Sequence, residues 1–314
     1  MIDQERTQSL FRKLEELLSH KGKPTPERVH HVRTTARRLE AVLQVCYPEP
    51  GSRVTRLMRQ LKKLRRRAGR VRDIDVQTAA LRGLKIGRES ERKSRLLAHL
   101  ADTRDSEEDK FRKAVQGALS KKVAKHLDQV ADELAQSMAP PKPGEPVQAP
   151  VWLGFEPVLA SLRMFVRATR ESKVLTPENL HGYRTRCKRI RYIAEMAGDT
   201  PETKRVAGAL KKLQDGIGDW HDWVTLTNTA EELFKRSLDS ALVAALRNIT
   251  SAKFVEARNL AEDIRRELMR EYRETLAADR EKRQRLAGGG KSAATSRRKP
   301  ASSVSMRDAR AEVA

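Results

Sequence analysis

The segment HHVRTTARR, residues 30–38, repeats histidine and arginine at the spacing of helical turns. At about 100° per residue, His30, Arg33 and Arg37 fall on one narrow stripe of a helix, and Val32 and Leu39 fall on the opposite side. Such a helix would bury its apolar side and present a ladder of cations on the other. Cations one turn apart repel one another, so a fold tolerates a ladder best where a bound anion relieves the repulsion.

The side-chain types in this ladder narrow the class of anion. Arginine can hold two phosphate oxygens at once, and lysine acts as a compact point charge, so a mixture of the two suits phosphates. Histidine adds a donor that strengthens when it is protonated near its reference pKa of about 6.5. A multivalent anion with charges spaced along a line would match the ladder best.

A second copy of the ladder lies in the other half of the chain, in the segment HGYRTRCKR at residues 181–189. The copies align His30 with His181, Arg33 with Arg184, Arg37 with Lys188, and Arg38 with Arg189. Further on, LKKL at residues 61–64 matches LKKL at residues 210–213, and Gly69 and Asp73 then fall on Gly218 and Asp222. Two matched blocks in the same order indicate an internal duplication.

More cations accompany each copy. On the helix that contains the first LKKL, apolar Leu57, Leu61 and Leu64 share one face, and the opposite face carries Arg59, Lys62, Lys63, Arg66 and Arg70. The second copy is weaker there, with Lys211 and Lys212, but its ladder gains Arg191. The aspartates that follow each block are expected to cap helices or to orient nearby arginines rather than to bind a metal.

The elements that must hold these ladders are helices. Helix formers and charges dominate, aromatic residues make up 4% of the chain, and no segment alternates like a strand. Prolines and glycines punctuate the pattern into four predicted helices in each half. These span residues 3–20, 26–47, 52–83 and 88–137, and then 151–172, 177–197, 201–236 with a break around Gly216 and Gly218, and 238–284.

This punctuation predicts an all-α protein with two helical repeats, at residues 1–137 and 151–284, each an antiparallel four-helix bundle. Between them, residues 138–150 carry five prolines and are predicted to be a linker. Residues 285–314 have few large apolar side chains and are predicted to be a disordered basic tail.

The net charge of the chain is +23, from 65 Lys and Arg against 42 Asp and Glu, which favours a polyanionic partner. Residues 28–72 alone hold 14 basic and 2 acidic side chains, so the excess is concentrated on two predicted helices. The two cysteines lack metal or redox spacing, which is typical of a reducing compartment. With no predicted signal peptide or membrane span, we expect a cytoplasmic protein with no membrane contact.

Two other function classes fit part of the pattern. A nonspecific nucleic-acid-binding protein would share the basic charge, and weak binding of DNA or RNA is expected because phosphate contacts are independent of sequence. His181, His221 with Asp222, and Asp239 imitate the ligand order of an HD-type metal-dependent phosphohydrolase. The duplication argues against that enzyme, because Arg72 occupies the position equivalent to His221. We expect no catalysis, no metal and no cofactor.

Four segments together resemble the CHAD domain, the conserved histidine α-helical domain: VHHVRTTARRLE, LKKLRRRAGRVRDIDV, LHGYRTRCKRIRYIAE and LKKLQDGIGDWHDW. The resemblance spans roughly residues 3–284. It implies two four-helix bundles related by a pseudo-twofold axis, whose basic faces converge on a cleft that binds inorganic polyphosphate. It also implies association with polyphosphate granules.

Carried over by position, the resemblance implies that the ligand-facing residues are His30, Arg33, Arg37 and Arg38 in one half and His181, Arg184, Lys188, Arg189 and Arg191 in the other. The chain departs from the family pattern at Glu40, where the family usually has a basic residue matching Arg191.

Overall fold

Threonine followed by proline begins three of the helices that carry the predicted ladders. In each case the threonine is the N-cap and the proline is the first helical residue, at Pro26, Pro177 and Pro201. Proline suits this position because its fixed φ is helical and its missing N–H would have had no partner there. The Thr25 and Thr200 side chains also accept hydrogen bonds from backbone amides in the first turn.

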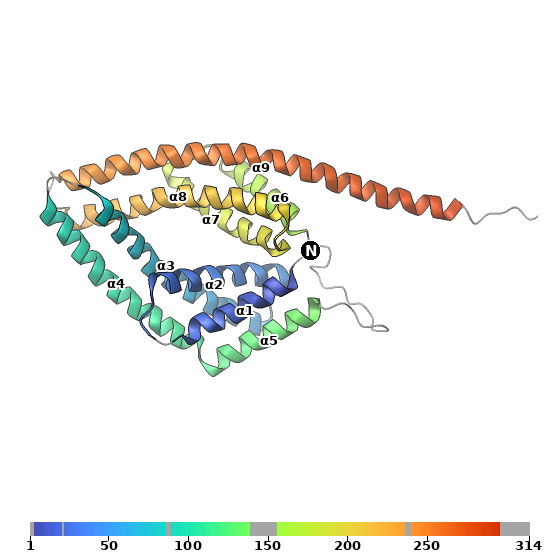
Figure 1. Ribbon diagram of the computed structural model, residues 1–314, viewed down its shortest axis with the longest axis horizontal. Helices are drawn as coiled ribbons and strands as arrows, with labels where there is room; N and C mark the ends of the chain where they lie inside the picture. Colours follow the sequence, from blue (N-terminus) through green and yellow to red (C-terminus); the bar gives the residue numbers. More distant parts are fainter. Residues whose placement is uncertain (1–2, 21, 86–88, 139–155, 236–239, 296–314) are drawn as a thin grey trace, which may run out of the picture. The chain divides into compact units, whose positions relative to one another are not determined.

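The computed structural model describes residues 3–20, 22–85, 89–138, 156–235 and 240–295, which are helical with no strand (Figure 1). The all-α prediction is therefore confirmed over these residues. The helices are α1 Gln4–Ser19, α2 Pro26–Cys46, α3 Ser52–Gly83, α4 Ser90–Ala118, α5 Lys121–Met138, α6 Pro157–Glu171, α7 Pro177–Ala194, the short 3-10 helix η1 Glu195–Ala197, α8 Pro201–Leu233 and α9 Ala241–Thr295.

One predicted helix, at residues 88–137, is wrong, because the chain turns at Leu119 and Ser120 between α4 and α5. The turn lets α5 fold back and bury Leu127, Val130 and Leu134 in the core that the end of α4 also enters. A continuous helix would have carried these apolar side chains away from that core.

The predicted break around Gly216 and Gly218 is also wrong, since α8 runs through both glycines. Their neighbours Leu213 and Ile217 are fully buried, and this packing offsets a helix-propensity cost of about 1 kcal/mol per glycine. The helix predicted to end at residue 284 continues as α9 to Thr295, into the predicted tail. The predicted linker beyond Met138 and the tail from residue 296 lie outside the described residues.

Two apolar cores correspond to the two halves of the sequence. The first is built by α1, α2, α3, α5 and the end of α4, and includes Leu39 and Leu61. The second is built by α6, α7, α8 and the middle of α9, and includes Tyr183 and Leu210. Buried Arg265 fixes α9 to the second core, because its guanidinium donates to the carbonyls of Ser172 and Lys173.

A third core, which the sequence did not predict, joins the two halves. It collects the ends of α3 and α8 and the beginnings of α4 and α9, with Leu81, Leu96, Leu226 and Leu246 completely or almost completely buried. At the same place, the Glu89 carboxylate accepts hydrogen bonds from the Ser240 hydroxyl and the Leu242 amide at the start of α9. Residues 1–272 form one compact unit as a result.

Residues 273–314 form a second unit, of which the structure describes only the last part of α9. Within the described residues, the structure contains no helix long and apolar enough to cross a membrane. Cys46 and Cys187 are both buried and free of disulfide bonds.

Candidate functional site

A cleft of about 760 Å³ opens between α2 and α3 on one side and α7 and α8 on the other. These helices pack as the pairs α2 with α3, α7 with α8, α2 with α7, and α3 with α8, so both sequence copies contribute a wall. Eight arginine and lysine side chains, three histidines and four aspartates line the cleft. Its lining is therefore cationic and comes from both halves of the chain, with six of the eight arginine and lysine side chains in the first half.

Half of the sixteen predicted site residues line this cleft. They come from three of the four helices that carry predicted site residues, all but the helix with the second LKKL, and they are His30, Arg33, Arg37, Arg66, Arg70, His181, Arg184 and Lys188. The structure thus brings together two ladders that lie about 150 residues apart in the sequence.

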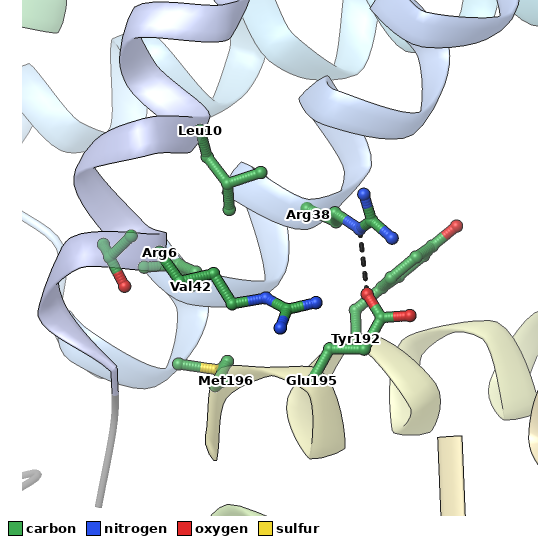
Figure 2. A pocket seen from close by; sticks show the side chains of 8 residues that line it. Arg6, Leu10, Arg38, Val42, Tyr192, Glu195 and Met196 are labelled. Atoms are coloured by element: carbon green, nitrogen blue, oxygen red, sulfur yellow. Dashed lines mark hydrogen bonds and ion pairs between the residues drawn. The ribbon is translucent and has the colours of Figure 1, made fainter. Parts of the chain in front are cut away.

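Two other predicted residues, Arg38 and Arg191, do not line the cleft. Arg38 Nε donates to the Glu195 carboxylate at 2.8 Å, and the Nε of Arg191 lies 3.3 Å from the same carboxylate. Both guanidiniums also lie against the ring of Tyr192. Figure 2 shows Arg38 directed at Glu195, in a small pocket where α1 and α2 meet the end of α7. Arg38 thereby links the two halves of the chain, and Arg191 pairs with the same carboxylate from within the second half.

The remaining predicted residues lie on neighbouring surfaces. Arg189 lines a smaller cavity beside the cleft, together with Arg37 and Lys188. The others are exposed and do not line the cleft: Arg59, Lys62, Lys63, Lys211 and Lys212. Lys211 pairs with Asp215 at 2.7 Å.

Sequence reasoning did not assign a ligand-facing role to several residues of the cleft. Arg65 follows directly after the first LKKL, and Arg72 occupies the repeat position of His221, which also lines the cleft. The repeat could have identified Arg72 and His221 as cleft residues, because each lies three residues after a matched glycine, Gly69 or Gly218. The rim aspartate Asp219 is partnered by Lys253 at 3.0 Å.

The matched arginines Arg33 and Arg184 are held by the matched elements of the repeat. Arg184 Nε donates to the backbone carbonyl of Gln214 at 2.9 Å, and its guanidinium lies directly against Gly218. Arg33 lies 3.4 Å from the Asp73 carboxylate and close to Gly69. The Asp73 pair agrees with the prediction that these aspartates orient arginines.

The cations of the cleft lie in surroundings that disfavour their charge. Burial, followed by repulsion from Arg184, Arg37 and Arg33, lowers the pKa of Lys188 to about 6. Burial and the same kind of repulsion also lower the pKa of Arg37 and of Arg184, although Tyr192 and Asp222 respectively oppose the shift. Charge of one sign is therefore concentrated in the cleft beyond what its aspartates neutralise.

The pKa values of the three histidines in the cleft are lowered as well. Burial is the largest cause that lowers the pKa of His30 and of His181, and neighbouring cations add to it. The ring centroids of His181 and His221 are 4.0 Å apart, and burial with repulsion from His181 lowers the pKa of His221 to about 4. Each of these rings would gain a proton more readily beside a bound anion.

The pKa of Asp222 is shifted in the opposite direction from the pKa values of the cleft histidines. Burial raises the pKa of its carboxyl to about 6, and nearby Asp73 adds to the rise, although Arg184 and Arg33 oppose it. For the metal-site alternative, Asp239 lies outside the described residues. Among the residues that are described, the side chains form no group of three or more His, Cys, Asp or Glu that could hold a metal.

Comparison with known proteins agrees with this arrangement. A family model described as the CHAD domain matches residues 8–231, which is well over half of the chain. The chain belongs to the CHAD domain family. The resemblance seen in the four sequence segments is therefore confirmed.

Solved structures show that this CHAD chain shares its fold with two distant proteins. The crystal structure of the CHAD domain from the plant Ricinus communis is 21% identical, with a TM-score of 0.56, and the match covers 84% of this chain and 91% of that one. PptA from Streptomyces chartreusis is 15% identical, with a TM-score of 0.53, covering 85% and 96%. No curated protein matches the sequence.

Proposed function

We propose that this CHAD protein binds inorganic polyphosphate in the cleft between α2–α3 and α7–α8. The observation that carries the proposal is the convergence of both sequence ladders on one cleft whose cations repel one another. CHAD domains are associated with polyphosphate binding in general. Burial is the largest cause that lowers the pKa of Lys188, Arg37 and Arg184, and a bound polyanion would offset the repulsion that adds to it.

The contrast with Arg265 supports a binding role for these cations. Arg265 is 5% exposed and satisfied by two carbonyls, the Tyr183 hydroxyl and Glu262, as expected of a structural arginine. In the cleft, by comparison, the buried Nε of Arg33 has no hydrogen-bond partner among the described residues. A donor left without an acceptor costs about 1–3 kcal/mol, so Arg33 is less fully satisfied within the protein than Arg265 is.

The shape and charge of the cleft favour a chain of phosphates over a single one. Cations line both walls, from His30 on α2 to Lys188 on α7, so one linear ligand can contact several of them at once. Once one phosphate is bound, its neighbours in the same chain bind as an intramolecular event. Orthophosphate gains no such advantage.

The test is a titration of the purified full-length protein with long-chain polyphosphate and with orthophosphate, at matched phosphate concentration and several salt concentrations. We expect polyphosphate to bind far more tightly per phosphate, and its affinity to fall as salt rises. Equal affinity per phosphate for the two ligands would overturn the proposal. A competition with single-stranded DNA belongs in the same experiment, because preference for DNA would favour the nucleic-acid alternative.

Three further parts of the proposal follow from this binding role. The two sequence copies are proposed to be a duplicated helical unit, each supplying one wall of the cleft. The protein is proposed to be a cytoplasmic binding module that associates with polyphosphate granules. It is proposed to hold its ligand without hydrolysing it, and incubation with polyphosphate should leave the chain-length distribution unchanged on a gel.

A further inference from the structure

A second cavity of about 330 Å³ adjoins the cleft. The two spaces share four lining residues, Arg37 on α2, Arg65 on α3, and Thr185 and Lys188 on α7. Three of the four are cations that can reach a ligand on either side. A polyanion that leaves the cleft past Arg37 and Lys188 would therefore enter this cavity.

The charge of the second cavity also suits an anion, with one exception. Besides the three shared cations, α7 contributes Arg186 and Arg189. Arg186 is held by the Ser172 hydroxyl at 2.6 Å, and Arg189 is exposed. The exception is Glu40 of α2, the sole carboxylate among the described residues that line the cavity.

Glu40 is held where a carboxylate is poorly accommodated. One oxygen accepts a hydrogen bond from Arg65 Nε at 2.6 Å, and the other is buried without a partner among the described residues. Burial raises the pKa of Glu40 despite the opposing attraction of Arg65, Arg37 and Lys62. A buried carboxylate with a hydrogen-bond partner on only one of its oxygens adds little to the stability of the fold. Stability therefore does not explain why Glu40 is paired with Arg65.

The internal repeat shows that this carboxylate is particular to one wall. Glu40 falls on Arg191 of the second copy, and Arg65 falls on Gln214. In the second copy neither position carries an acid. The first wall therefore differs from the second in two ways. It has a carboxylate, Glu40, beside the path of the anion, and it has an arginine, Arg65, that donates a hydrogen bond to that carboxylate.

We propose that Glu40 determines how much of a polyphosphate chain this protein engages, by closing the second cavity to phosphate. This inference rests on the proposed function. Glu40 acts in two ways: its own charge repels a phosphate that enters the cavity, and its bond to Arg65 withdraws a cation that both spaces share. A short chain fills the cleft and does not meet Glu40, whereas a long chain does.

The test compares Glu40→Gln with the unmodified full chain, using tripolyphosphate and long-chain polyphosphate as probes. The substitution keeps the size of the side chain and removes its charge. We expect affinity for the long chain to rise about fivefold, the effect of one accessible ion pair gained, and affinity for tripolyphosphate to stay within about twofold. The salt dependence for the long chain should steepen by about 0.7 per added phosphate contact.

Two further variants separate this effect from a general change of charge. Glu16→Gln removes an exposed carboxylate on α1 that lines neither space, and should leave both affinities unchanged. Arg189→Gln removes a cation that lines only the second cavity. In the unmodified chain it should have little effect, and combined with Glu40→Gln it should cancel most of the gain, which is a coupling that a double-mutant cycle measures.

An equal gain for short and long chains would overturn the inference, and so would no gain, or a gain that survives Arg189→Gln. Should Glu40→Gln melt well below the unmodified protein, Glu40→Ala gives the same comparison without an unpaired polar group. Failure of the proposed function would look different. In that case the unmodified chain would not distinguish polyphosphate from orthophosphate at all.

Discussion

The two walls of the cleft differ in charge and join their helices by different chemistry. Six of the eight arginine and lysine side chains that line the cleft belong to α2–α3, and two belong to α7–α8. In the α7–α8 wall, the Gln214 side chain donates to the buried Cys187 carbonyl at 3.0 Å, a neutral link between the two helices. In the α2–α3 wall the corresponding link is ionic, from Arg65 to Glu40. The neutral link places no acid beside the second cavity, whereas the ionic link places the Glu40 carboxylate there. The same helical frame therefore places a carboxylate against the second cavity from one wall and none from the other.

The walls also differ in how their charge depends on pH. The α7–α8 wall relies on Lys188, His181 and His221, and the pKa of each is lowered. The equivalent positions of the α2–α3 wall hold Arg37, His30 and Arg72. Arginine remains protonated at any physiological pH, even where burial lowers its pKa. The second wall should thus be the one that responds to pH.

The largest effect is expected from removing both ladders together, because this tests whether the walls act as one site. Changing Arg33, Arg37, Arg184 and Lys188 to Gln removes four groups that are cationic when a phosphate chain is bound. At about 1 kcal/mol per charge, affinity for polyphosphate should fall by roughly a thousandfold. The slope of log affinity against log salt should flatten by about 3, at about 0.7 per phosphate contact.

The matched control removes the same charge elsewhere. Arg12, Lys13, Arg163 and Arg170 are exposed on α1 and α6 and do not line the cleft. Changing them to Gln should weaken binding only through long-range attraction, by a fewfold. Both variants are compared after melting curves establish that they are folded. Equal losses in the two variants would mean that the ladders have no special role and that the protein is a general polycation.

A pH titration sharpens the difference between the walls. With its pKa lowered to about 6, Lys188 is mostly neutral at pH 8 in the free protein, and a bound phosphate chain raises this pKa again. Binding therefore takes up a proton, and affinity should fall by up to about tenfold per unit as pH rises from 6 to 8. Asp222, whose pKa is raised to about 6, gains negative charge over the same range and acts in the same direction.

Lys188→Arg should flatten this dependence, because arginine stays charged. We expect the variant to bind about tenfold more tightly than the unmodified chain at pH 8 and equally at pH 5.5. His181→Gln serves as the comparison, since it removes another α7 group whose pKa is lowered in the free protein and would rise beside a bound anion. A parallel pH dependence in the Lys188→Arg variant would show that another group takes up the proton.

The matched glycines test how firmly each wall holds its arginine. A Cβ at Gly218 would overlap the Arg184 guanidinium, whereas a Cβ at Gly69 would lie 3.5 Å from Arg33 Nε, an ordinary contact. Gly218→Ala should therefore displace Arg184 and weaken polyphosphate binding about tenfold, the value of one charge-assisted contact. Gly69→Ala should leave affinity unchanged.

Gly208→Ala is the control for the Gly218 variant, because it lies on the same helix and an added Cβ there meets no atom within 4 Å. All three substitutions raise helix propensity by a similar amount, about 1 kcal/mol. A loss of affinity shared by Gly208→Ala would trace the effect to the helix. A loss shared by Gly69→Ala would show that both arginines are held equally tightly.

The parts of the structure that local signals determine were predictable from the sequence. Thr–Pro pairs fix the starts of α2, α7 and α8, and helical spacing alone placed His30, Arg33 and Arg37 on one face. What escaped prediction depends on distant partners. Burial against the first core decides the turn between α4 and α5, and the third core is built from both halves of the chain.

The same distinction explains which of the predicted site residues line one cleft in the structure. Spacing cannot reveal that Arg38 turns away from the cleft, because its partner Glu195 is 157 residues further along the chain. Nor can it reveal that Glu40 meets Arg65, although the repeat marks Glu40 as an exception. A duplicated sequence identifies equivalent positions, and the differences between the copies then show where to look for a specialised wall.

The smallest effect is expected from the end of the chain, which supplies charge that belongs to neither wall. Residues 296–314 lie outside the described residues and carry five basic and two acidic side chains, a small part of the net charge of +23. Deleting them should lower polyphosphate affinity by about twofold, through weaker long-range attraction, and leave the salt slope within about 1 of its original value. The deletion should also leave the response to Lys188→Arg intact, because that response arises in the cleft. If the shortened chain instead lost most of its affinity while the four-residue cleft variant retained it, the tail would be the polyanion site and the two walls would serve only as its support.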